Sequence, residues 1–188
     1  MKRKLINSIG PLLAIALASI FLLVSCSSDQ VAENEEIQTF DFKLERAETS
    51  DDQIAVLTKA MRKYHNFQVA QAQGYIIEAS PFVPGMGFHY VNPDYVDGTF
   101  DILNPEILVY YLDQDGNKVF GAAEYLIPIP GCDVANEYSN PPEGFIGSDD
   151  SWFVNCTAGG WTLHAWVGLE NPEGVFVASN NTVPNPPN

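Results

Sequence analysis

The stretch Pro84-Gly85-Met86-Gly87-Phe88-His89-Tyr90-Val91-Asn92-Pro93 combines a glycine-bracketed turn, a histidine in a short aromatic strand and a closing proline. We expect the strand at residues 88–91, where His89 and Val91 share the face opposite Phe88 and Tyr90. The chain has three histidines, and this one lies between the other two.

Upstream, residues 51–73 contain neither glycine nor proline, and their apolar side chains recur with helical spacing. The preceding Ser50-Asp51-Asp52-Gln53 resembles a capping box, and Gly74 is typical of a helix end. We therefore predict one long helix over residues 51–73. His65 lies on its apolar stripe, next to Tyr64.

Downstream, turn signals separate short apolar runs that have the length and alternation of strands. Strands are expected at residues 75–80, 106–112, 118–128, 161–169 and 175–177. The second and third of these form a hairpin through the turn at 113–117. The prediction is an α+β fold in which one long helix packs on a curved antiparallel sheet, cystatin-like or NTF2-like by analogy only.

Two strands carry polar side chains that a sheet would have to accommodate. Simple alternation places Glu124 on an apolar row with Phe120, Ala122 and Leu126, so a buried Glu124 would need a partner. In the strand at 161–169, His164 lies on the less apolar face, which we expect to line a pocket.

The three histidines, one each in the helix, the middle strand and the late strand, suggest a metal site. Neutral imidazole binds zinc and copper, so we expect His65, His89 and His164 to converge on such an ion. Glu124 is expected either as the fourth ligand or as an acid in contact with a ligand, and Glu78 is the second choice. Their wide spacing does not require convergence. In the competing interpretation, each histidine is a hydrogen-bonded structural residue.

The N-terminus has the architecture of a secretory signal, because Lys2-Arg3-Lys4 precedes an apolar run. Leu23-Val24-Ser25-Cys26 resembles a bacterial lipobox, which implies cleavage after residue 25 and acylation of Cys26. Ser27-Ser28-Asp29 resembles lipoprotein export signals of Bacteroidetes and favours the outer membrane. The alternative is an ordinary secreted protein with a cysteine near its cleavage site.

The mature chain would be strongly acidic. The full sequence has a net charge of −15, and loss of three basic residues with the signal would make it −18. Nucleic acid is an improbable partner, because phosphate binding requires clustered Lys and Arg. Residues 26–50 are polar and acidic, and we expect them to form a flexible tether between the lipid bilayer and a single domain at 51–188.

Two cysteines remain after Cys26, and in an oxidising compartment such a pair usually forms a disulfide. A bond between Cys132 and Cys156 would close a loop rich in proline and glycine. On the chain-entropy model it would contribute on the order of 3 kcal/mol. Metal ligation by these thiols is the alternative.

Four further motifs accompany the central stretch: Asn104-Pro105-Glu106-Ile107, Ala123-Glu124-Tyr125, Leu163-His164-Ala165-Trp166 and Asn171-Pro172-Glu173-Gly174. Together they resemble a group of uncharacterised exported bacterial proteins that share the glycine-methionine-glycine-aromatic-histidine motif. The resemblance covers most of residues 60–180 and implies a shared fold. It implies no activity.

Two classes of function stay open. One is an envelope lipoprotein with a metal site, used for metal handling or for metal-assisted chemistry. The other is a non-enzymatic module that binds a small ligand or a partner protein in an aromatic cleft formed by Tyr64, Phe88, Tyr90 and Trp166. Whether the protein is an enzyme is not decided by its sequence.

Overall fold

The computed structural model describes residues 27–147 and 149–187. The expected signal peptide, residues 1–25, and the expected lipidation site Cys26 lie outside the described residues. The chain divides into two compact units, Met1–Asp41 and Phe42–Asn188. Among the described residues, no helix combines the length and the apolar character needed to cross a membrane.

Helix α1 (Ser27–Leu44) occupies most of the segment for which a flexible tether was expected. The segment lacks glycine and proline and is rich in good helix formers such as glutamate and glutamine, which explains the helix. Between residues 34 and 44 no side chain is buried. The segment is therefore largely exposed, as expected of a tether, but it is helical.

The long helix predicted over residues 51–73 is three shorter ones: α2 (Ser50–Ala60), the 3-10 helix η1 (Met61–His65) and α3 (Phe67–Ala72). Its capping box lies one residue earlier than expected, with Thr49 as N-cap and Asp52 as its partner. Asn66 has an extended backbone, and its side chain accepts a hydrogen bond from the Gln68 N–H. The helix is therefore interrupted at Asn66 although no glycine or proline is present. The asparagine side chain competes for a backbone N–H and so caps a new helix.

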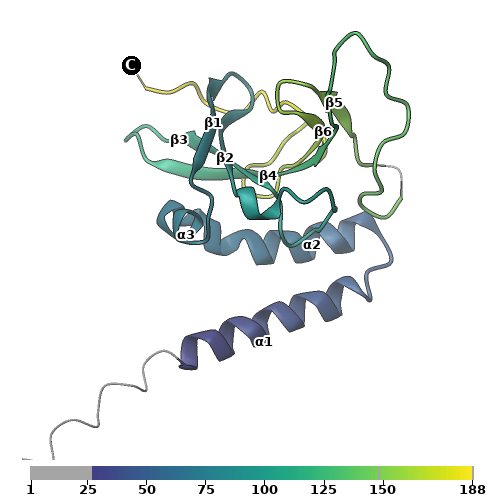
Figure 1. The fold of residues 1–188 in the computed structure, drawn as a ribbon. Helices are drawn as coiled ribbons and strands as arrows, with labels where there is room; N and C mark the ends of the chain where they lie inside the picture. The colour runs from purple at the N-terminus through teal and green to yellow at the C-terminus, as the bar shows by residue number, and fades with distance from the viewer. Residues whose placement is uncertain (1–26, 148, 188) are drawn as a thin grey trace, which may run out of the picture. The chain divides into compact units, whose positions relative to one another are not determined.

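Six antiparallel strands form one curled, half-barrel sheet in the order β1-β2-β3-β4-β6-β5 (Figure 1). The strands are β1 (Ile77–Val83), β2 (Gly87–Val91), β3 (Ile107–Leu112), β4 (Lys118–Pro128), β5 (Phe153–Asn155) and β6 (Gly160–Ala165). A short 3-10 helix, η2 (Pro93–Tyr95), follows β2. The α+β class and the β3–β4 hairpin are confirmed, whereas the analogy to cystatin-like or NTF2-like folds is not. The strand expected at 175–177 is a turn region.

Helices α2 and α3, with η1 between them, cover one face of the sheet, here called the helix face (Figure 1). Phe67 of α3 packs edge-on against Tyr90 and Tyr110, with ring centroids 4.7 and 4.9 Å apart. The Tyr110 hydroxyl donates to the Tyr64 carbonyl, 2.7 Å away. This face is therefore an aromatic core in which the Tyr110 hydroxyl finds a backbone acceptor.

The chain after β6 covers the opposite face, here called the inner face. Trp166 and Val183 from this C-terminal segment pack with Val109 of β3 and Ala122 of β4. The Trp166 indole N–H donates to the Val177 carbonyl at 2.7 Å. Both faces are therefore covered along the central strands, and polar residues there, such as Glu124 and His164, are buried.

A β-bulge in β4 decides which residues lie on which face. Val109 pairs with Ala122, but the next residue, Tyr110, pairs with Phe120, so Gly121 is the extra residue. The alternation therefore changes phase at Gly121. Phe120 lies on the helix face with Tyr110, whereas Ala122 and Glu124 lie on the inner face, which corrects the single row predicted for them.

The predicted disulfide between Cys132 and Cys156 is present. It closes a loop that contributes to the core, because Phe145 within it is 4 % exposed and packs against Tyr125 and Phe176. The loop therefore forms part of the hydrophobic core.

Candidate metal centre

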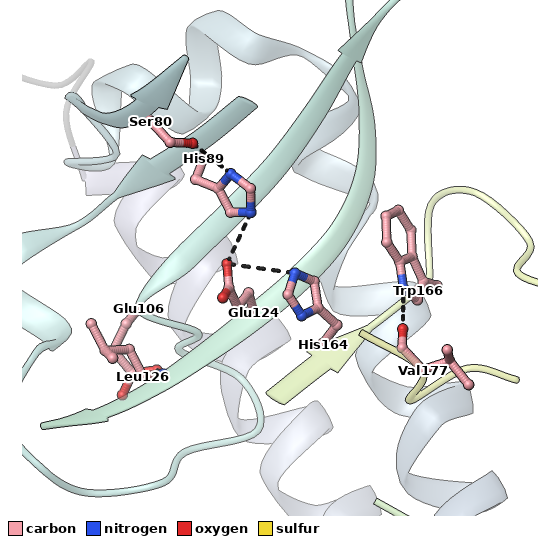
Figure 2. A network of polar contacts seen from close by, with 8 residues as sticks. All are labelled: Ser80, His89, Glu106, Glu124, Leu126, His164, Trp166 and Val177. Atoms are coloured by element: carbon pink, nitrogen blue, oxygen red, sulfur yellow. Dashed lines mark hydrogen bonds and ion pairs between the residues drawn. The ribbon is translucent and has the colours of Figure 1, made fainter. Parts of the chain in front are cut away.

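Three strands each bring one polar side chain to the same part of the inner face. His89 comes from β2, Glu124 from β4 and His164 from β6 (Figure 2). Glu124 and His164 are directly paired residues of neighbouring strands, and His89 is paired with Val109 of the intervening strand β3. The sheet register therefore sets the relative position of the three side chains.

The ligand atoms are close enough to share one ion. Oε2 of Glu124 lies 3.5 Å from Nε2 of His89 and 3.7 Å from Nε2 of His164. The three residues offer ligand atoms that all lie within 4.8 Å of one another. Ligands about 2.1 Å from a tetrahedral zinc ion are roughly 3.4 Å apart, so small side-chain adjustments suffice. This buried group could hold a metal ion.

The ring of His89 is oriented by a second hydrogen bond. Its Nδ1 lies 2.8 Å from the Ser80 hydroxyl oxygen of the neighbouring strand β1 (Figure 2). If Nδ1 carries the proton and donates it to Ser80, Nε2 presents a lone pair toward Glu124. This is how metal-binding histidines are usually held, since an outer partner fixes both tautomer and orientation.

The ring of His164 has two aromatic neighbours. Phe153 of β5 and Trp166 both stack nearly parallel to it, with centroids 6.3 and 5.9 Å away. These neighbours restrict rotation of the imidazole without occupying either ring nitrogen. Both nitrogens stay available to a ligand.

Burial changes the ionisation of all three residues. It raises the pKa of Glu124 to about 8, with a smaller contribution from the nearby Glu106 carboxylate. It lowers the pKa of His89 to about 4 and that of His164 to about 3, the latter also through His89. At neutral pH without metal, the group is therefore an uncharged cluster of one carboxylic acid and two neutral imidazoles.

Several buried polar atoms of this cluster lack partners. Oε2 of Glu124 and both ring nitrogens of His164 have no hydrogen-bond partner among the described residues. Such atoms are rare in folded proteins, because each costs roughly 1–3 kcal/mol of desolvation. A metal ion would bind Oε2 of Glu124 and one nitrogen of His164, so the donor set fits such an ion.

His65, expected as the third imidazole, does not belong to the cluster. It ends η1, its side chain is exposed, and its ring lies 5.5 Å from that of Phe120 on the helix face. The prediction required the helix to cover the face that carries His164. The helices cover the opposite face, so the sheet separates His65 from His89 and His164.

Two other glutamates have different partners. Glu78, the second choice as ligand, accepts a 2.6 Å hydrogen bond from the Tyr90 hydroxyl. Glu106, which the sequence did not single out, is fully buried, and its Oε2 accepts from the Leu126 N–H at 3.0 Å (Figure 2). Burial raises the pKa of Glu106 to about 7.

Ser80 and Phe153 were also missed. Only the strand register places Ser80 opposite His89 and Phe153 beside His164. Neither residue lies in a motif that indicates metal binding.

The four aromatic residues expected to line one cleft are divided between the two faces. Tyr64 and Tyr90 belong to the helix face and Trp166 to the inner face, and all three are at most 5 % exposed. Phe88 is paired with Tyr110, and its ring lies 4.9 Å from the Lys118 ammonium. A cavity of about 470 Å³ lies elsewhere, in the disulfide loop, where Pro141, Pro142 and Trp152 are among its lining residues.

Comparisons of the chain with protein-family models, with curated proteins and with solved structures found no match. The candidate site is therefore assigned from its geometry alone: two imidazoles and one carboxylate, buried on the inner face of the sheet and within reach of one ion.

Proposed function

We propose that this chain is a metal-binding lipoprotein of a bacterial cell envelope, with zinc or copper held by His89, Glu124 and His164. The observation that carries the proposal is the convergence of three buried ligand atoms, all within 4.8 Å of one another. Two imidazoles with one carboxylate form a ligand set known from catalytic zinc sites, and such sites keep one coordination position open. Both metal handling and metal-assisted chemistry are compatible with that arrangement.

Calorimetric titration of the chelator-treated protein tests the metal site. We expect one zinc or copper ion per chain, with affinity lost in His164→Ala and retained in His65→Ala. The second variant is a matched control, because it removes an imidazole that lies outside the cluster. Equal loss of binding in both variants, or no saturable binding at all, would refute the site.

The envelope location rests on the sequence of the N-terminus. A basic start, an apolar run and Leu23-Val24-Ser25-Cys26 support cleavage before Cys26 and its acylation, which would anchor the protein in the outer membrane of a Gram-negative bacterium. Mass spectrometry of the protein extracted from membranes should find an N-terminal acylated cysteine. An unmodified N-terminus at another residue would contradict the anchor.

A second candidate function is the binding of a small ligand in the cavity of the disulfide loop. The observation in its favour is that Nε1 of Trp152, beside this cavity, is buried and has no hydrogen-bond partner among the described residues. A ligand there should change tryptophan fluorescence in the wild type and not in Trp152→Phe. Binding that survives this substitution unchanged would place the ligand elsewhere.

A further inference from the structure

We propose that the metal ion held by His89, Glu124 and His164 takes one small monoanion at its open coordination position. This inference rests on the proposed metal site and specifies what that site binds. The first step is a count of charge. Two neutral imidazoles and one carboxylate leave a divalent ion with a net charge of about +1.

In the part of the chain that the structure describes, the surroundings add no further anionic ligand that would neutralise that charge. Among the described residues, the ion-pair contacts of Glu124 are with the two histidines. The same face of the sheet carries Val109 and Ala122, which are buried apolar residues. A buried charge without a counter-ion is costly, so a bound anion that makes the site neutral is favoured over a neutral ligand.

The nearest additional acid is directed elsewhere. Ile107 and its pairing partner Glu124 share the inner face of the sheet. Glu106 immediately precedes Ile107, so alternation directs the Glu106 side chain to the helix face. Its Oε2 is engaged by the Leu126 N–H at 3.0 Å. It therefore does not supply a second carboxylate ligand to the ion.

The walls of the site limit the size of the anion. The rings of Phe153 and Trp166 both lie nearly parallel to the His164 ring, with centroids 6.3 and 5.9 Å away. The His164 side chain is 1 % exposed and that of His89 is 11 % exposed, so the approach is from the His89 side. A hydroxide or a linear triatomic anion such as azide fits this description better than a tetrahedral oxyanion such as sulfate.

The test uses the full chain loaded with cobalt(II), whose visible spectrum reports coordination. Titration with azide should change the spectrum with saturation at one azide per cobalt. Acetonitrile, a neutral molecule of similar length and shape, and sulfate, a larger dianion, should leave the spectrum unchanged at the same concentrations. Equal responses to azide and acetonitrile would overturn the charge argument, and an equal response to sulfate would overturn the size argument.

Glu124→Gln tests whether the affinity for azide rises when the net charge of the site becomes more positive. It preserves shape while raising the net charge of the loaded site to about +2, so azide should bind at least threefold more tightly at saturating cobalt. General damage to the site would weaken azide binding instead, and that result would contradict the inference. If this variant fails to retain cobalt, the comparison of azide with acetonitrile on the wild type decides the question.

The outcomes separate the two proposals. Cobalt binding without any response to azide would overturn the monoanion site and leave the metal site intact. Failure of the wild type to bind cobalt, zinc or copper would overturn both.

Discussion

Replacing Glu124 with glutamine should alter how the stability of the metal-free protein depends on pH. The carboxyl is 3 % exposed, and its Oε2 has no hydrogen-bond partner among the described residues. Burial raises its pKa from 4.5 to about 8. A raised pKa means that its contribution to stability is fully present below about pH 4.5 and is lost as the pH rises through about 8.

The size of the effect follows from the two pKa values. A difference of about 3.5 pH units corresponds to on the order of 5 kcal/mol at 1.36 kcal/mol per unit. Water entering beside the ionised carboxylate would reduce this, so we expect the wild type to lose about 2–4 kcal/mol more than Glu124→Gln between pH 5 and pH 9. Glu106 has a raised pKa in both proteins, so its contribution cancels in the comparison.

Urea unfolding of chelator-treated protein, followed by tryptophan fluorescence at both pH values, measures the difference. The lowered pKa values of His89 and His164 reduce the stability at pH 5, but both proteins contain these histidines, so their contribution cancels in the comparison. Parallel pH profiles for the wild type and Glu124→Gln would show that the carboxyl is solvated and would refute the buried cluster.

Three further predictions concern the groups that support the site and the loop. Phe145→Ala should lower the free energy of unfolding by about 3–5 kcal/mol in urea titrations, because it leaves a cavity beside the core aromatic rings. Ser80→Ala should weaken metal binding by roughly 10–100-fold in calorimetric titrations, because the His89 ring loses its outer hydrogen bond. Replacing both Cys132 and Cys156 with serine should lower the stability by about 3 kcal/mol while the far-UV circular dichroism persists.

Each of these predictions has a contrasting outcome. Phe42→Ala, at a side chain 57 % exposed, should be nearly neutral, so an equal loss there would discount the cavity explanation. Ser80→Thr retains a hydroxyl and should restore most of the affinity. A loss of metal affinity in Ser80→Thr as large as that in Ser80→Ala would indicate damage to the strand. Loss of the circular dichroism spectrum in the double serine variant would show that the loop is needed to form the sheet.

Much of the fold could be predicted because its signals are local. The turn at residues 113–117 and the alternation on either side of it specify the β3–β4 hairpin without knowledge of the rest. The pairing of Cys132 with Cys156 could be predicted because two cysteines remain after Cys26 and an oxidising compartment was expected, and the structure contains the bond. His89, His164 and Glu124 were all selected as ligands, and the structure brings them together.

The errors have non-local causes. The helix was predicted as continuous because Asn66 resembles any polar helix residue until its side chain is seen capping α3. The bulge at Gly121 shifts the alternation of β4, and only the partner strand reveals it. His65 was predicted on the wrong side of the sheet. The helices cover the face that the C-terminal segment leaves open, and the periodicity of the sequence does not indicate which face that is.

Metal analysis of the protein, purified without added metal, tests the central claim most directly. The account predicts about one equivalent of zinc or copper in the wild type and in His65→Ala, and almost none in His164→Ala. Metal retained in His164→Ala, or lost equally from His65→Ala, would contradict a site built from His89, Glu124 and His164.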